Sequence, residues 1–167
     1  MNRNTSMHFL FNSKYAPLTN HIGFIKCEID IVLQVFTDWL NWLPKTKSRK
    51  LEYSTQAFSG SFEEALITFK TFNKLDVRQR LLFETAGKWI GYIDNYWKGP
   101  KIANLNVVSK RLKKEYIGIK ALEHSFGKLP GANGWGGGGF HHTNSDGTHR
   151  LVELSPEGNT WEFHQGG

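Results

Sequence analysis

The histidines near the carboxyl end are the first feature of this sequence that could do chemistry, because four of the seven lie at or after position 141. The run from FHHT onward is typical of a three-strand meander with turns at NSDG and SPEG. With four-residue turns, His142 lies opposite His149, and His149 lies opposite His164. Three imidazoles in such a row can bind zinc, with Glu153 or Glu162 as a further ligand or base.

The alternative interpretation of this row is an exposed polar face without a metal. The same pairing gathers an apolar set on the other face of the meander, and we expect that set to face the core. Its members are Val152, Leu154, Trp161 and Phe163. The histidines would then be solvated.

A glycine-rich run, GKLPGANGWGGGG at 127–139, contains Gly134, Gly136 and Gly139 in G-x-G-x-x-G spacing. A dinucleotide-binding fingerprint follows a strand and opens a helix, whose N-terminus holds the pyrophosphate. Here the run leads into a predicted strand instead, so we interpret it as a mobile surface loop. Trp135 is the residue through which that loop would contact a partner.

Basic residues are concentrated in one segment. From Lys98 to Lys120 there are seven basic residues and one acidic residue, Glu115. The net charge of this segment is therefore +6 (7 minus 1), which equals the formal net charge of the whole chain. A helix predicted over 104–116 carries four of them away from its buried stripe. These are Lys110, Arg111, Lys113 and Lys114. With Trp97 nearby, they could bind an acidic protein or nucleic-acid phosphates, although a solvated lysine face has the same pattern.

Composition excludes several classes of protein. The chain has 167 residues, 39% of them hydrophobic, and a single cysteine, Cys27, which excludes an internal disulfide and a Cys-rich zinc site. No apolar run approaches the ~18 residues of a membrane span, and the first residues do not resemble a signal peptide. We therefore predict a cytoplasmic protein without a membrane partner. No G-x-S-x-G, P-loop, H-E-x-x-H or C-x-x-C motif occurs.

The predicted elements come in the order strand, helix, strand, helix, hairpin, helix, strand and meander. The spans are a strand at 22–29, a helix at 32–43 ended by Pro44, a strand at 51–58, a helix from the Ser61–Glu64 capping box, a hairpin of 78–84 with 88–94, the helix at 104–116 and a strand at 117–122. This order predicts one α+β domain over 1–167, with a mainly antiparallel sheet and about three helices packed on one face. Residues 1–20 are expected to be flexible.

Two stretches resemble small uncharacterised bacterial cytoplasmic proteins, over about half of the chain. The stretches are KWIGYIDNYWKGP and GTHRLVELSPEGNTWEFHQGG, and the matching positions are Trp89, Asp94, Asn95, Gly99, Arg150, Trp161 and Phe163. In size and in the lack of catalytic motifs the chain also resembles the immunity partners encoded beside bacterial toxins. That resemblance implies a stable scaffold with a surface complementary to one target. From composition and turn preference alone, we expect Asp94 and Asn95 to be turn residues.

The leading hypothesis is therefore a non-catalytic cytoplasmic domain that binds an acidic protein partner, as an immunity or antitoxin-like protein would. Immunity proteins against nucleases are generally acidic, so a net charge of +6 argues against a nuclease target. One alternative is a nucleic-acid-binding module that uses the basic helix at 104–116. The other is a metal-dependent enzyme that holds zinc on His142, His149 and His164.

Overall fold

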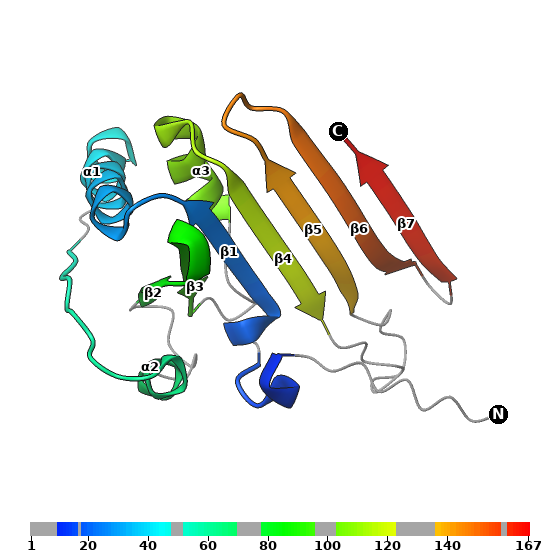
Figure 1. The fold of residues 1–167 in the computed structure, drawn as a ribbon, viewed down its shortest axis with the longest axis horizontal. Coiled ribbons are helices and arrows are strands. Elements are labelled where there is room, and N and C mark those ends of the chain that lie inside the picture. The colour runs from blue at the N-terminus through cyan, green and yellow to red at the C-terminus, as the bar shows by residue number, and fades with distance from the viewer. Residues whose placement is uncertain are drawn as a thin grey trace.

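A seven-stranded antiparallel sheet forms the centre of the protein, in the order β2-β3-β1-β4-β5-β6-β7 (Figure 1). The computed structural model describes residues 10–16, 18–47, 52–69, 78–95, 103–122, 136–157 and 160–167. Within them the strands are β1 (His21–Lys26), β2 (Arg80–Glu84), β3 (Trp89–Asp94), β4 (Tyr116–Leu122), β5 (Gly137–Thr143), β6 (His149–Glu157) and β7 (Thr160–Gly166). The helices are α1 (Ile29–Lys47), α2 (Phe62–Thr68) and α3 (Ala103–Leu112), with short 3-10 turns η1 (Leu10–Ser13), η2 (Leu18–Asn20) and η3 (Ala86–Lys88). The prediction of an α+β fold with a mainly antiparallel sheet is confirmed.

One face of the β2-β3-β1-β4 half is covered by α1 and α3. Ile25 of β1, Tyr92 of β3 and Tyr116 of β4 point to this face and are almost completely buried. The ring of Phe36 in α1 stacks on Tyr92 with a centroid separation of 5.7 Å. Each large side chain buried here contributes about 1.5–3 kcal/mol to folding. Cys27 belongs to the same cluster, which fits a core thiol rather than a reactive one.

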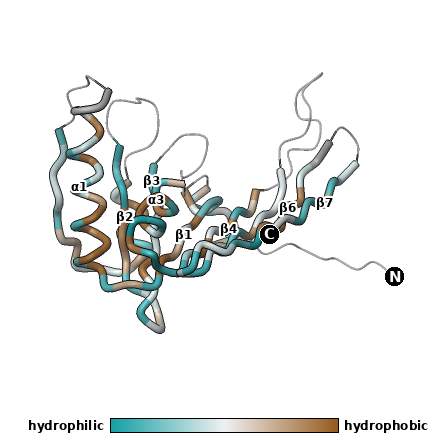
Figure 2. Tube along the Cα trace, turned by 90° about the horizontal axis from the view of Figure 1, so that it is seen from above, coloured by the Kyte–Doolittle hydropathy of each residue, from teal (hydrophilic) through white to brown (hydrophobic). Residues whose placement is uncertain are grey.

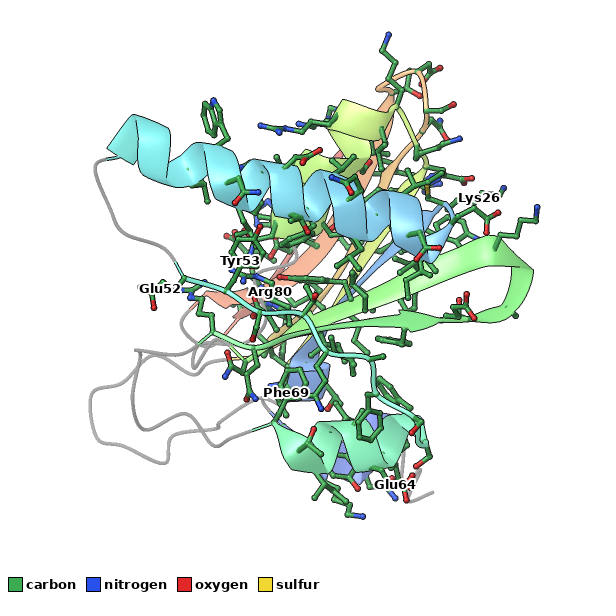
Figure 3. All side chains as sticks on the ribbon, turned by 90° about the vertical axis from the view of Figure 1, so that its left-hand side faces the viewer. Lys26, Glu52, Tyr53, Glu64, Phe69 and Arg80 are labelled. Atoms are coloured by element: carbon green, nitrogen blue, oxygen red, sulfur yellow. The ribbon has the colours of Figure 1, made fainter. Side chains whose placement is uncertain are left out.

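The opposite face of β2, β3 and β1 is covered by α2 and the chain around η2. Ile22 and Ile93 point to it, and they pack with Leu18 and with Leu66 and Phe69 from the α2 region. Figure 3 shows α1 and α2 on opposite sides of the β2–β3 hairpin, with Phe69 between α2 and the hairpin. The expectation that all helices pack on one face is thus wrong for α2. Both faces of β1 and β3 carry large apolar side chains, so each face needs its own cover.

Local sequence signals explain several element ends. Ser61 caps α2: its hydroxyl accepts from the Glu64 backbone N–H at 3.2 Å, and the Glu64 carboxylate accepts from the Ser61 N–H at 2.7 Å. Gly87 adopts a φ of 69° in the short turn between β2 and β3, as its place in the predicted hairpin requires. The capping box and the hairpin are therefore both confirmed.

Other boundaries differ from prediction. The α1 helix continues through Pro44 to Lys47, since a proline nitrogen lacks a donor but can still sit in a helical backbone at a cost. Residues 52–58 form no regular element, whereas Gly137–Gly139, expected in a loop, begin β5. The α3 helix ends at Leu112, before the predicted limit of 116. Residues 10–20, expected to be flexible, contain η1 and η2, and Phe11 and Tyr15 pack on the second core cluster.

The sheet continues beyond its helices. Figure 2 shows β6 and β7 extending away from α1 and α3. No helix within the described ranges covers either face of β5, β6 or β7, so the described helices form no second layer there. None of the helices in the described part of the chain has the length and apolar composition of a membrane span.

Candidate protein-binding face

The strand register divides the β4–β7 half of the sheet into two chemically different faces. Ile119 of β4 pairs with Phe140 of β5, and Phe140 pairs with Val152 of β6. Because paired residues point to the same side, alternate positions of the four strands share this face. We call it the apolar face; its described members are Ile117, Ile119, Ala121, Gly138, Phe140, His142, Arg150, Val152, Leu154, Trp161, Phe163 and Gln165.

Large side chains on the apolar face are unusually accessible. Phe163 is 63% exposed, Trp161 46%, Ile119 43% and Phe140 38%. The face continues the second core cluster without a break, because Ile22, buried under the α2 side, pairs with Ile119. The sequence correctly predicts that Val152, Leu154, Trp161 and Phe163 share one face. That face is not a core within the described residues, and contiguous exposed apolar surface of this kind marks interaction sites.

Charge on the apolar face is positive. Arg150 is exposed on it, and no acidic residue occupies its described strand positions in β4–β7. Glu115, which precedes β4, accepts hydrogen bonds from His142 Nε2 at 2.9 Å and from Lys26 Nζ at 3.2 Å. These two donors, with His142 the stronger, lower the pKa of the Glu115 carboxyl. Its negative charge is therefore already paired.

The basic residues predicted on α3 gather at the end of that helix. Lys110, Arg111, Lys113 and Lys114 are all exposed. The helix ends in a Schellman motif, in which the Lys114 N–H donates to the Ser109 carbonyl at 3.1 Å and Lys113 adopts a φ of 52°. None of the four forms an ion pair within the described residues, although Arg111 lies over the Trp42 ring.

The basic end of α3 lies at the same end of the sheet as Arg150 and Lys26, but α3 packs on the opposite, polar face. The connection from α3 to β4 lies at the same end as the turn between β5 and β6 (Figure 1). Arg150 follows that turn, and Lys26 ends β1 beside Glu115. Cationic side chains thus border one end of the apolar face.

The predicted row of histidines does not form. His142 pairs with Arg150 rather than with His149, and His164 pairs with Glu153. The turn between β5 and β6 is centred half a residue later than predicted, which moves His142 to the opposite face of the sheet. Pro156 and Glu157 also extend β6, so its turn into β7 lies two residues later. Within the described ranges, no three His, Cys, Asp or Glu side chains group in a way that could hold a metal ion such as zinc.

A different histidine pair lies on the polar face of β4–β7. His141 and His149 stack edge to face with ring centroids 6.1 Å apart, and His141 also packs against Tyr116. Burial, followed by the charges of His149 and Lys110, lowers the pKa of His141. Lys120 and Glu153 form an ion pair at 3.0 Å on the same face. The predicted meander places His142, not His141, beside His149, and the difference is one residue of register.

Asp94, expected in a turn, is the completely buried last residue of β3. It accepts a hydrogen bond from the Tyr92 hydroxyl at 3.2 Å, and Asn104 of α3 donates to that hydroxyl at 3.3 Å. Burial, with a smaller effect of Asp94, raises the pKa of Tyr92. The cluster ties β3 to the start of α3. The alternation of Tyr92 and Asp94 within a strand is the signal that places both on one face.

Four positions singled out in the sequence lie outside the described residues: Trp97, Gly99, Gly134 and Trp135. A scan of family models and searches of curated proteins and of solved structures found no match for this chain. The surface itself is therefore the source of any functional inference.

Proposed function

We propose that this protein is a non-catalytic, cytoplasmic protein-binding domain whose partner packs on the apolar face of β4–β7. The observation that carries the proposal is the accessibility of Ile119, Phe140, Trp161 and Phe163 on one continuous face. Exposed aromatic and aliphatic side chains of this kind are the residues that supply most of the binding energy in protein interfaces.

The chemistry of the partner follows from the charge around the face. Arg150 lies on it, Lys26 ends the neighbouring strand β1 at its border, and Glu115 is paired with His142 and Lys26. A partner that matches this pattern has an apolar centre and acidic residues at one end of its contact surface. An immunity or antitoxin-like inhibitor of an acidic target protein is the role in which such a surface suffices without catalytic groups.

The test compares three baits in affinity capture from the host lysate, each with nuclease present. The face variant Ile119→Ser/Phe140→Ser removes apolar side chains from the middle of the face. The control variant Ile67→Ser removes a side chain that is 67% exposed on α2, away from the face. We expect one protein to be captured by the unaltered chain and by the control but not by the face variant.

Direct titration of the captured protein then measures affinity. We expect the face variant to bind about 100-fold more weakly, as loss of a hot-spot pair does. Reversing Arg150 with Arg150→Glu should weaken binding about tenfold and reduce its salt dependence. Equal affinity of the face variant and the unaltered chain would overturn the proposal. Circular dichroism and urea unfolding confirm that each variant is folded.

A nucleic-acid-binding function is the second candidate, favoured by the four exposed basic side chains at the end of α3. The variant Lys110→Glu/Arg111→Glu/Lys113→Glu/Lys114→Glu separates the two functions. If nucleic acid is the ligand, this variant loses binding, affinity falls steeply with salt, and the face variant binds normally. If a protein is the ligand, the face variant has the larger defect.

A further inference from the structure

We propose that two copies of this chain associate through β7, whose outer edge would pair antiparallel with β7 of a second copy about a two-fold axis at Phe163. The inference concerns the edge of the sheet and is independent of the partner proposed for the apolar face. It rests on the exposed edge of β7, on its residue order and on its charges.

Among the described residues, the edge of β7 lacks several of the features that usually block strand pairing. The strand reads TWEFHQG over seven residues, without lysine, proline or a bulge in its pairing with β6. Soluble proteins commonly protect an edge with such residues or with a covering segment. At the other edge of the sheet, residues 52–60 pass outside β2 (Figure 1, Figure 3). No described segment lies outside β7 in this way.

The residue order of β7 is self-complementary. In an antiparallel pair centred on Phe163, Glu162 lies opposite His164 of the partner subunit, and His164 lies opposite the partner subunit's Glu162. Within one chain His164 Nε2 lies 3.1 Å from a Glu162 carboxylate oxygen, so the two side chains sit on the same face of the strand. The symmetric pairing therefore places a carboxylate opposite an imidazole twice, as an isologous contact requires.

The same register also joins the apolar side chains. Phe163, which is 63% exposed, lies opposite Phe163 of the partner subunit. Trp161 lies opposite the partner subunit's Gln165 on the same face. A slide of one residue would instead place Glu162 or His164 opposite Phe163, and a slide of two residues would oppose two glutamates or two histidines at the centre. Charge and apolar contact thus favour a single register.

Sedimentation equilibrium of the full chain measures the association. We expect the average mass to rise from 19.1 kDa toward twice that value as the protein concentration is increased to about 200 micromolar. The association is weak because a single strand pairing buries a small interface. The variant Phe163→Lys should weaken the dimer at least ~tenfold, since two like charges would meet at the axis. The control Ile67→Lys, at a similarly exposed apolar position, should leave the dimer intact.

Charge exchange tests the register. His164→Glu should weaken the dimer because it places carboxylates opposite each other, and Glu162→His/His164→Glu should restore it. Under mild oxidation Phe163→Cys should crosslink, because self-paired residues have Cα atoms about 4.5–5.5 Å apart, within the range of a disulfide. Thr160→Cys should not, because its two copies would be about 20 Å apart along the strands. The native Cys27 is buried and does not interfere.

A monomer at every concentration overturns this proposal, as does a dimer that Phe163→Lys leaves intact. Crosslinking of Thr160→Cys as readily as Phe163→Cys overturns the register. Loss of the dimer in Ile119→Ser/Phe140→Ser would show that copies associate through their apolar faces, which contradicts edge pairing. If the dimer persists in that variant while the heterologous partner is lost, both proposals stand.

Discussion

Two halves of one sheet use the same alternation of side chains with opposite results. Over β2, β3 and β1, α1 and α3 cover one face and α2 covers the other, and Phe36 of α1 is 4% exposed. In β5–β7 no described helix covers either face, and Phe163 is 63% exposed. The first half supplies the core of the fold. The second half is a platform attached to that core, and its apolar side chains are left accessible for another molecule.

The largest effect expected from this difference is on stability. Phe36→Ala should lower the free energy of unfolding by about 3–5 kcal/mol, because it leaves a cavity against Tyr92. Phe163→Ala should lower it by less than about 1 kcal/mol in the monomer, since little surface is buried there. Urea denaturation at low protein concentration measures both. Similar losses for the two variants would mean that the halves are equally packed.

A smaller loss of stability is expected at α2, the helix that covers the second face of the core. Ser61→Ala removes the hydroxyl that accepts from the Glu64 N–H and should cost about 1 kcal/mol. Ser61→Asp should keep most of that stability, since aspartate is also a good N-cap. Urea denaturation measures the free energy of unfolding of both variants. No loss in Ser61→Ala would imply that α2 is not coupled to the core.

At the basic end of α3, Lys113 adopts a left-handed conformation with a φ of 52°. Lys113→Gly should raise the free energy of unfolding by about 0.5–1 kcal/mol, because glycine adopts this conformation without strain. Lys114→Gly, next to it, should not stabilise. If Lys113 also contacts the acidic partner, Lys113→Gly binds more weakly while folding more stably, and thermal unfolding with titration separates the two effects.

The uncovered half should also respond to pH through His141. The pKa of His141 is lowered below its ordinary value of 6.5, first by burial. The folded protein therefore binds fewer protons than the unfolded chain, and this contribution to stability is lost as the pH falls from about 6.5 toward the folded pKa. His141→Phe should show a weaker pH dependence of unfolding in that window. An unchanged profile would contradict the packing of His141 on Tyr116.

Sequence patterns predicted the covered half better than the uncovered one. The alternation in β1, the capping box at Ser61 and the β2–β3 hairpin are local signals, and the structure has all three. The placement of α2 could not be predicted in this way, because it depends on which face of β3 lacked a cover. The predicted end of α1 at Pro44 was wrong, because a proline destabilises a helix without preventing a helical backbone beyond it.

The candidate site was predicted in part. The exposure of the basic residues on α3 and the shared face of Val152, Leu154, Trp161 and Phe163 follow from periodicity. The histidine row failed because a half-residue change in the centre of one turn reverses the face of His142. Periodicity also cannot say whether an apolar face is covered. The sequence therefore suggested a core where the structure has an accessible surface.

The most direct test of the central claim is calorimetric titration of the captured partner with the unaltered chain, Ile119→Ser/Phe140→Ser and Ile67→Ser at several temperatures. Binding on the apolar face predicts a negative heat-capacity change, an affinity about 100-fold lower for the face variant, and an unchanged affinity for Ile67→Ser. Equal affinities for all three proteins would contradict the claim that the uncovered half of the sheet is the binding surface.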